Sequence, residues 1–175
     1  MTDQLEMQRI NEEISRRFQA VEKSISSSSD VKALFETLLD RIRGEFEIPF
    51  VWLSIVDKPE LRGLIGTMQS SEILKDRLNV IDEISYFELT GGSTAPILAT
   101  GDMKPFFRLL PKNQKYLLRS VAIAPITLHT FPIGSLNHGD SSPLRYEPGM
   151  DTSLLAHMAA EVSEHLSGIL SRHES

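Results

Sequence analysis

The sequence contains no cysteine among its 175 residues. This absence excludes disulfide bonds, cysteine-based zinc sites, thiol catalysis and thioether attachment of a chromophore. Long apolar runs are missing as well, since no stretch approaches the roughly 18 to 20 residues of a membrane-spanning helix. No signal-peptide pattern opens the chain. We therefore expect a cytoplasmic protein with no membrane among its partners.

Basic residues are in the minority, with 18 Lys and Arg against 24 Asp and Glu and a net charge of −6. This balance argues against nucleic acid as a partner. The apolar share of 41% and the charged share of 24% are typical of a globular protein. The length suits one domain with a helical extension and leaves room for a sizeable core.

Patterns for catalysis and metal binding are also missing. The chain has five histidines, which are His129, His138, His157, His165 and His173. None of them forms a metal-binding pair by spacing, so we expect no metal or cofactor, and histidines that are partly exposed or hydrogen-bonded. No serine stands in a G-x-S-x-G turn. Gly91-Gly92 lacks the lysine of a phosphate-binding loop and predicts a tight turn instead. We predict that the protein is not an enzyme.

The chain begins with an apolar stripe on a helix predicted over residues 3–25. The stripe consists of Met7, Ile10, Ile14, Phe18, Val21 and Ile25, and its spacing follows the turn of an α-helix. Four serines then break the helix. The stripe has two interpretations, since it can pack on its own domain or pair with a second subunit. A long exposed apolar stripe is costly, so we predict a homodimer interface at these six residues.

The remaining elements are predicted from caps, breakers and apolar periodicity. They are, in order, a helix over 31–46 capped by Asp30, a central strand over 50–56, a helix near 71–79, strands over 84–89 and 95–99, short helices within 104–118 split at Pro111, a strand over 120–128, a turn at 130–132, a strand over 133–138, and a closing helix capped by Asp151 or Thr152. This order predicts an α+β fold, with an antiparallel sheet of about five or six strands and helices mainly on one face.

The run from Leu136 to Leu155 carries a recognisable motif. Its matching positions are Gly139, Arg145, Tyr146, Pro148, Met150, Thr152 and Leu155. The run resembles the C-terminal signature of a bacterial GAF-like family, "domain of unknown function 484", which reads Arg-Phe-x-Pro-x-Met-Gly-Thr-x-Phe-Leu into the last helix. Asp140 and Asp151 depart from the family pattern, where Ser and Gly are usual. Segments 101–106 and 120–126 resemble the family more loosely.

The resemblance implies a GAF-like domain over residues 30–175, preceded by an amphipathic helix over 1–29. Variable loops are expected to cover a concave front of the sheet. The signature of cyclic-nucleotide-binding GAF domains is missing. The GAF enzymes that reduce methionine sulfoxide need cysteine, so the chain cannot be one of them.

Basic and aromatic residues alternate between residues 104 and 119. The basic residues are Lys104, Arg108, Lys112, Lys115 and Arg119, with no acid among them. In a GAF-like fold this segment would lie over the front pocket, where it could favour a small anionic ligand. The other interpretation is an amphipathic segment with buried aromatics and solvated lysines. The predicted ligand contacts are Phe87, Phe106, Phe107, Arg108, Tyr116 and Arg119.

These observations predict a non-catalytic GAF-type sensory or regulatory domain that binds a small molecule, a protein partner, or both. We expect a homodimer that signals to a separate, unknown downstream protein. The alternative is a protein-interaction adaptor whose pocket is filled by its own side chains.

Overall fold

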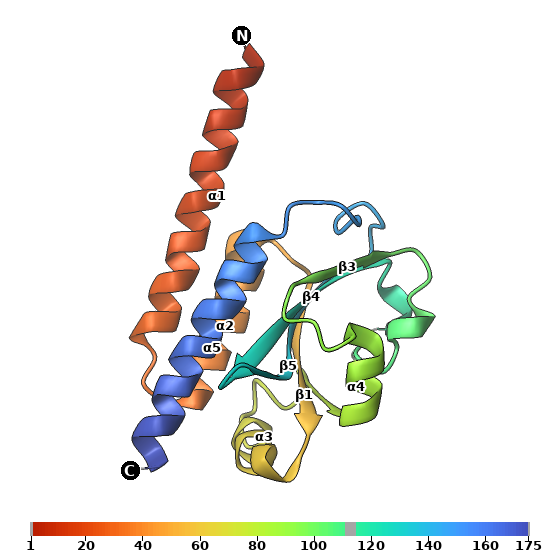
Figure 1. Cartoon of the computed structure of the whole chain (residues 1–175). Coiled ribbons are helices and arrows are strands. Elements are labelled where there is room, and N and C mark those ends of the chain that lie inside the picture. Colours follow the sequence, from red (N-terminus) through yellow and green to blue (C-terminus); the bar gives the residue numbers. More distant parts are fainter. Residues whose placement is uncertain (1, 111–114, 175) are drawn as a thin grey trace.

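A five-stranded sheet forms the centre of the protein in the computed structural model, which describes residues 2–110 and 115–174 (Figure 1). The strands are β1 (Phe50–Asp57), β2 (Leu78–Asp82), β3 (Ile97–Thr100), β4 (Ser120–Leu128) and β5 (Phe131–Asp140). Their order in the sheet is β2-β1-β5-β4-β3. β1 and β2 are parallel and the other pairs are antiparallel. The predicted α+β fold is confirmed, although the sheet is mixed rather than wholly antiparallel.

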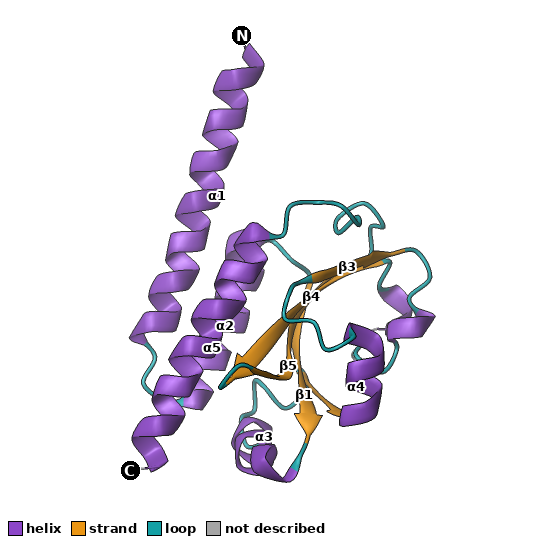
Figure 2. Ribbon diagram, in the orientation of Figure 1, coloured by secondary structure: helices purple, strands orange, loops and turns teal. Residues whose placement is uncertain are grey.

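Helices cover the sheet unequally (Figure 2). They are α1 (Thr2–Ser27), α2 (Val31–Phe46), α3 (Arg62–Gln69), α4 (Glu83–Thr90) and α5 (Ser153–Glu174), with short 3₁₀ turns at Pro59–Leu61, Lys104–Phe106 and Lys115–Leu117. α1, α2 and α5 gather on one side, here called the back, and α4 lies on the other, here called the front (Figure 1). α2 begins as predicted at the Asp30 cap, whose carboxylate accepts a 2.8 Å hydrogen bond from the Ala33 N–H.

The N-terminal helix is only half docked. Its C-terminal half packs on α2 and α5 of the same chain, while its N-terminal half projects beyond the body of the protein (Figure 1). Phe18, Val21 and Ile25 are buried, whereas Met7 and Ile10 are 63% and 55% exposed. The boundary between docked and projecting parts falls near Ile14, which is half-buried.

The strand predicted over 84–89 is wrong, because these residues form α4. Asp82 caps this helix by accepting a 2.9 Å hydrogen bond from the Ser85 N–H. Gly91 ends it in the left-handed conformation, with φ of 65°. Where the period of an apolar run is ambiguous, a capping residue before the run and a glycine after it favour a helix. The tight turn predicted at Gly91-Gly92 is consistent with the positive φ of both residues.

Other predicted boundaries need smaller corrections. The helix expected near 71–79 is a series of turns leading into β2, because Leu78 to Asp82 pair with the edge of β1. The hairpin turn is centred on His129 and Thr130, both with positive φ, so β5 begins at Phe131 rather than at Ile133. Within residues 104–110 and 115–118, the short helices expected are 3₁₀ turns. The break predicted at Pro111 lies outside the described residues.

The closing helix starts at Ser153, directly after the two predicted capping residues. The Asp151 carboxylate accepts 2.9 Å and 2.5 Å hydrogen bonds from the N–H and the hydroxyl of Ser153, and these bonds lower the pKa of Asp151. The Thr152 carbonyl accepts the first helical bond from Ala156. Of the two residues, Asp151 therefore supplies the side-chain oxygen at this helix start.

We expect Asp151→Ala to lower the melting temperature at neutral pH, because it removes the side-chain acceptor at the start of α5. The folded-state pKa of Asp151 lies below its ordinary value. Its stabilisation is therefore present above the ordinary pKa and is lost as the pH falls through the folded pKa. The difference from the parent protein should shrink in strong acid in a pH series of thermal melts. Asp151→Asn, which keeps an acceptor, should lose less. Identical melting curves for Asp151→Ala and the parent at neutral pH would contradict this role.

Candidate functional site

A layer of buried polar side chains lies on the front of the sheet. Strand alternation directs Trp52 and Ser54 of β1 to this face, together with Asn137 of β5, which pairs with Trp52 in register. The Asn137 amide donates to the Ser54 hydroxyl at 2.9 Å. All three side chains are at most 2% exposed. This is the face on which the sequence predicts a ligand pocket.

The segment before residue 111 fills this face. The Leu109 carbonyl accepts hydrogen bonds from the Trp52 indole at 2.7 Å and from the Ser54 hydroxyl at 3.2 Å. The neighbouring Arg108 carbonyl accepts a 2.6 Å bond from the Asn79 amide. The Leu109 and Leu110 side chains are 0% and 1% exposed. Residues 108–110 therefore act as a plug, which hydrogen bonds and apolar burial hold against the front of the sheet.

The predicted ligand contacts surround this plug, and none of them lines the cavity described below. Phe106 and Phe107 are half-buried beside the core, as is Phe87 on α4. Tyr116 is 73% exposed and its ring meets Phe107 edge-on, with ring centroids 5.4 Å apart. The Arg108 guanidinium hydrogen-bonds the Ser85 hydroxyl.

The predicted basic cluster lies along the same segment. Arg108 and Arg119 are both exposed, and so is Lys104. Lys112 lies outside the described residues. Arg119 also extends the pairing of β4 with β5 through its backbone, since its N–H donates to the Asp140 carbonyl at 2.9 Å. Among the side chains that the structure describes, Lys104 and Arg119 are therefore exposed, whereas the Arg108 guanidinium contacts the buried Ser85 hydroxyl on α4.

A cavity of about 310 Å³ lies on the back of the molecule, between the sheet and the start of α5. Its apolar walls include Ile14 from α1, Phe46 at the end of α2, Ile48 just after that helix, Leu98 from β3, and Leu154 and Met158 from α5. The loop before α5 supplies Arg145, Tyr146 and Met150. His138 of β5 completes the wall from the sheet. Residues from both terminal helices and from the sheet therefore meet around this cavity.

Two buried polar atoms in residues that line this cavity form no hydrogen bond of ordinary geometry among the described residues, although Arg145 lies beside the second of them. They are Nε2 of His138 and the hydroxyl of Tyr146. These side chains are 1% and 9% exposed. Burial, with the Arg145 charge nearby, lowers the pKa of His138 to about 4, so the ring is neutral at pH 7. Burial raises the pKa of Tyr146 to about 12. The wall therefore offers two uncharged hydrogen-bonding groups.

The guanidinium of Arg145 already has polar partners within the chain. Its Nη2 donates to the Phe46 carbonyl at 2.7 Å, and its Nη1 lies 3.3 Å from Oδ2 of Asp140. The guanidinium carbon also lies 5.9 Å from the Tyr146 ring centroid. Arg145 therefore fixes the loop to the end of α2 and to β5.

The sequence did not predict this cavity, although the recognised motif includes several of the residues that line it. Arg145, Tyr146, Met150 and Leu155 of the recognised motif all line the cavity. Of the two alternatives expected for the histidines, partial exposure does not apply to His138, which is 1% exposed and whose Nε2 has no hydrogen-bond partner among the described residues. One feature of the sequence could have indicated a special role for His138. It shares a strand face with Leu136, at a position where an apolar side chain is usual.

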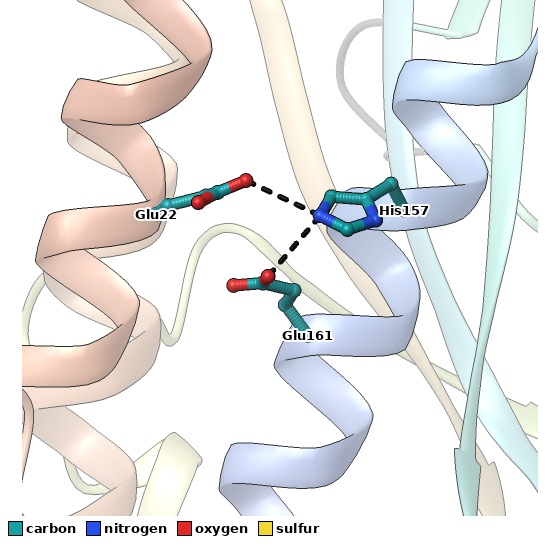
Figure 3. Close-up of side chains that lie close together, drawn as sticks. All are labelled: Glu22, His157 and Glu161. Atoms are coloured by element: carbon teal, nitrogen blue, oxygen red, sulfur yellow. Dashed lines mark ion pairs between the residues drawn. The ribbon is translucent and has the colours of Figure 1, made fainter.

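A second cluster ties α1 to α5. Nε2 of His157 lies 3.3 Å from Oε1 of Glu22 and 3.2 Å from Oε1 of Glu161 (Figure 3). The ligand atoms of all three residues lie within 4.8 Å of one another, so the trio could hold a divalent cation. The side chains are 57%, 32% and 32% exposed, respectively, and partly exposed acidic groups often stand this close without an ion. The arrangement places a polar contact between α1 and α5, beside the Phe18 ring.

No family model matches the chain, and no curated protein matches it. Solved structures do resemble it. The GAF domain of an Acinetobacter phosphoenolpyruvate-protein phosphotransferase has a TM-score of 0.64 at 14% identity, covering 89% of this chain and 93% of that one. The free methionine-R-sulfoxide reductase of Neisseria meningitidis has a TM-score of 0.57 at 14% identity, covering 89% of each chain.

The GAF domain of the cyanobacteriochrome TePixJ is also similar, with a TM-score of 0.55 at 15% identity, covering 84% of this chain and 95% of that one. These comparisons and the sheet order show that the chain has a GAF-like fold. At such low identity the likeness extends to the fold alone. Among the helices of the described residues, none is both long and apolar enough to cross a membrane.

Proposed function

We propose that the protein is a non-catalytic GAF-type sensory or regulatory domain of the bacterial "domain of unknown function 484" family, working in the cytoplasm. In this proposal a small molecule enters the cavity at His138 and a separate protein reads the resulting change in α1. The observation that carries the proposal is the shared wall of the cavity, to which α1, the motif loop and α5 all contribute. A ligand there would contact both terminal helices at once.

The first test is native mass spectrometry of freshly purified protein, compared with its denatured mass. A bound small molecule appears as a mass difference that disappears on denaturation, which supports a sensor. A series of preparations with no such difference, together with no thermal shift from any small molecule screened, would count against ligand sensing.

The proposed assembly is a homodimer through the exposed part of the α1 stripe. Phe18, Val21 and Ile25 already pack within their own chain, so Met7, Ile10 and Ile14 remain to meet a second copy. An exposed apolar stripe on a projecting helix is a common feature of helix pairing.

We expect Ile10→Glu to convert the dimer to a monomer, because it places a charge at the centre of this exposed part. Its melting temperature, measured at a dilution where the parent is also monomeric, should be unchanged, because Ile10 is 55% exposed within the chain. Gln8→Glu, which adds a charge on another face of the helix, is the matched control. Light scattering at tens of micromolar is the measurement. A monomeric parent protein at that concentration would end the dimer proposal.

An adaptor with a filled pocket is the second candidate, and the plug at residues 108–110 is the observation that favours it. An anionic ligand at the front would have to displace Leu109 and Leu110. If it does so, nucleotides or small carboxylates should raise the melting temperature, since ligand at a hundred times its dissociation constant adds about 2.7 kcal/mol. The effect should shrink in Arg108→Ala or Arg119→Ala and with added salt. No shift from such anions favours the filled front.

A further inference from the structure

We infer that the cavity beside His138 binds a small, uncharged, mainly apolar molecule that carries one hydrogen-bonding group, and that this molecule extends the docked part of α1. The inference rests on the proposed sensory function and assigns the ligand class and the regulated element. The site is separate from the plugged front, on the opposite face of the sheet.

The size and lining of the cavity point to such a ligand. Its volume of about 310 Å³ is at the lower end of the range of small-molecule sites, which are mostly apolar with a few placed polar groups. Most of its wall is aliphatic or aromatic, from five different parts of the chain. The ligand is therefore compact and mostly hydrocarbon.

The unpartnered polar atoms point to one polar group on that ligand. A buried polar atom without a hydrogen bond costs free energy that a partner would recover. Nε2 of His138 is such an atom, in a residue that lines the cavity. The Tyr146 hydroxyl, in another lining residue, is also buried without a hydrogen bond of ordinary geometry, with Arg145 beside it. A hydroxyl both donates and accepts, so a ligand hydroxyl can satisfy either group in its neutral form. Neither the apolar face of a helix nor a hydrocarbon ligand could form such a hydrogen bond.

The charges around the cavity disfavour an anion. Arg145 is the basic residue of the lining, and its guanidinium already contacts Asp140 and the Phe46 carbonyl. Asp151 stands in the cavity lining and is ionised at neutral pH. An anionic ligand would meet this carboxylate without a free positive charge to balance it.

The position of Ile14 links the site to α1. Ile14 lines the cavity at the boundary between the docked residues of α1 and its projecting part. A ligand in the cavity gives Ile14 an additional apolar contact. Occupancy should therefore favour the docked arrangement of the middle of α1.

The test uses three probes of similar size on the full chain, which are phenol, toluene and benzoate. Binding is followed by titration with amide NMR spectra. We expect phenol to bind about three to ten times more tightly than toluene, the ratio that one net hydrogen bond supplies, and benzoate to bind weakest. The amide resonances that shift when phenol binds should include those of residues 10–18. Equal affinities for phenol and toluene, or tightest binding of benzoate, would overturn the inference.

Three substitutions complete the test. Tyr146→Phe removes a buried hydroxyl that forms no hydrogen bond of ordinary geometry, although Arg145 lies beside it. It should fold nearly as well as the parent and lose about threefold or more of the preference for phenol. Tyr116→Phe, at an exposed position, should keep that preference. Leu154→Trp should fill the mouth of the cavity and weaken phenol and toluene equally.

The outcomes separate this inference from the proposed function. If a molecule co-purifies with the protein and remains bound in Leu154→Trp, the protein is still a sensor but this cavity is not its site. If Leu154→Trp leaves probe binding intact and abolishes dimer formation, a second copy covers the cavity and the inference is overturned.

Discussion

Replacing Gly134 with alanine should leave little folded protein. A Cβ atom at this position would lie 2.0 Å from the Ser54 carbonyl oxygen and 3.0 Å from the Ile55 Cα, which belong to the backbone of the neighbouring central strand. The backbone of a paired strand cannot move aside as a flexible side chain can. The Gly134 carbonyl also accepts a 2.7 Å hydrogen bond from the buried Tyr86 hydroxyl. We expect a loss of about 3 kcal/mol or more in the free energy of unfolding.

The matched control is Gly44→Ala on α2, where an added Cβ has nothing within 4 Å. Alanine in a helix is better than glycine by about 0.5 to 1 kcal/mol, so this variant should be slightly more stable than the parent. Urea titrations followed by circular dichroism measure both changes. Equal stability of Gly134→Ala and Gly44→Ala would mean that β1 and β5 lie farther apart than described.

Leu109→Ala should produce the other large effect, because the Leu109 side chain is fully buried in the plug. Truncating a buried leucine to alanine costs about 2 to 5 kcal/mol. The chain has one tryptophan, Trp52, which is 2% exposed and donates to the Leu109 carbonyl. Loosening the plug should therefore also move its fluorescence to longer wavelength under native conditions.

Leu117→Ala serves as the control for the same segment, since Leu117 is 57% exposed. It should change the free energy of unfolding by less than about 0.5 kcal/mol and leave the tryptophan spectrum unchanged. If Leu109→Ala behaves like Leu117→Ala, the front is open in solution, and an anionic ligand there becomes the better explanation of the basic cluster.

The strands of the central sheet could be predicted where burial alone decides their conformation. β4 has the predicted bounds of Ser120 and Leu128 because an apolar run of that length between turns has few alternatives. α4 was missed because a short apolar run fits both a strand and a helix, and the decision rests on Asp82 and Gly91 on either side. The parallel pairing of β2 was missed because pairing depends on distant parts of the chain.

The candidate site was only partly predictable, for the same reason. The motif residues Arg145, Tyr146 and Met150 could be selected from their pattern, but their shared cavity depends on Ile14 and Leu98, which lie far away in sequence. The front was expected to be concave, whereas Leu109 and Leu110 fill it. Whether a loop covers a pocket or enters it depends on side-chain packing that no local pattern encodes.

The half-docked arrangement of α1 would enlarge any tilt of this helix that begins beside the cavity. From Phe18 to Thr2 the helix advances 16 residues, or about 24 Å at 1.5 Å per residue. A tilt of about 10° at Phe18 would therefore carry the far end through roughly 4 Å, several times the displacement at Ile14. In the proposed function, a small displacement of α1 beside the cavity would therefore become a larger displacement at the N-terminal end of the helix.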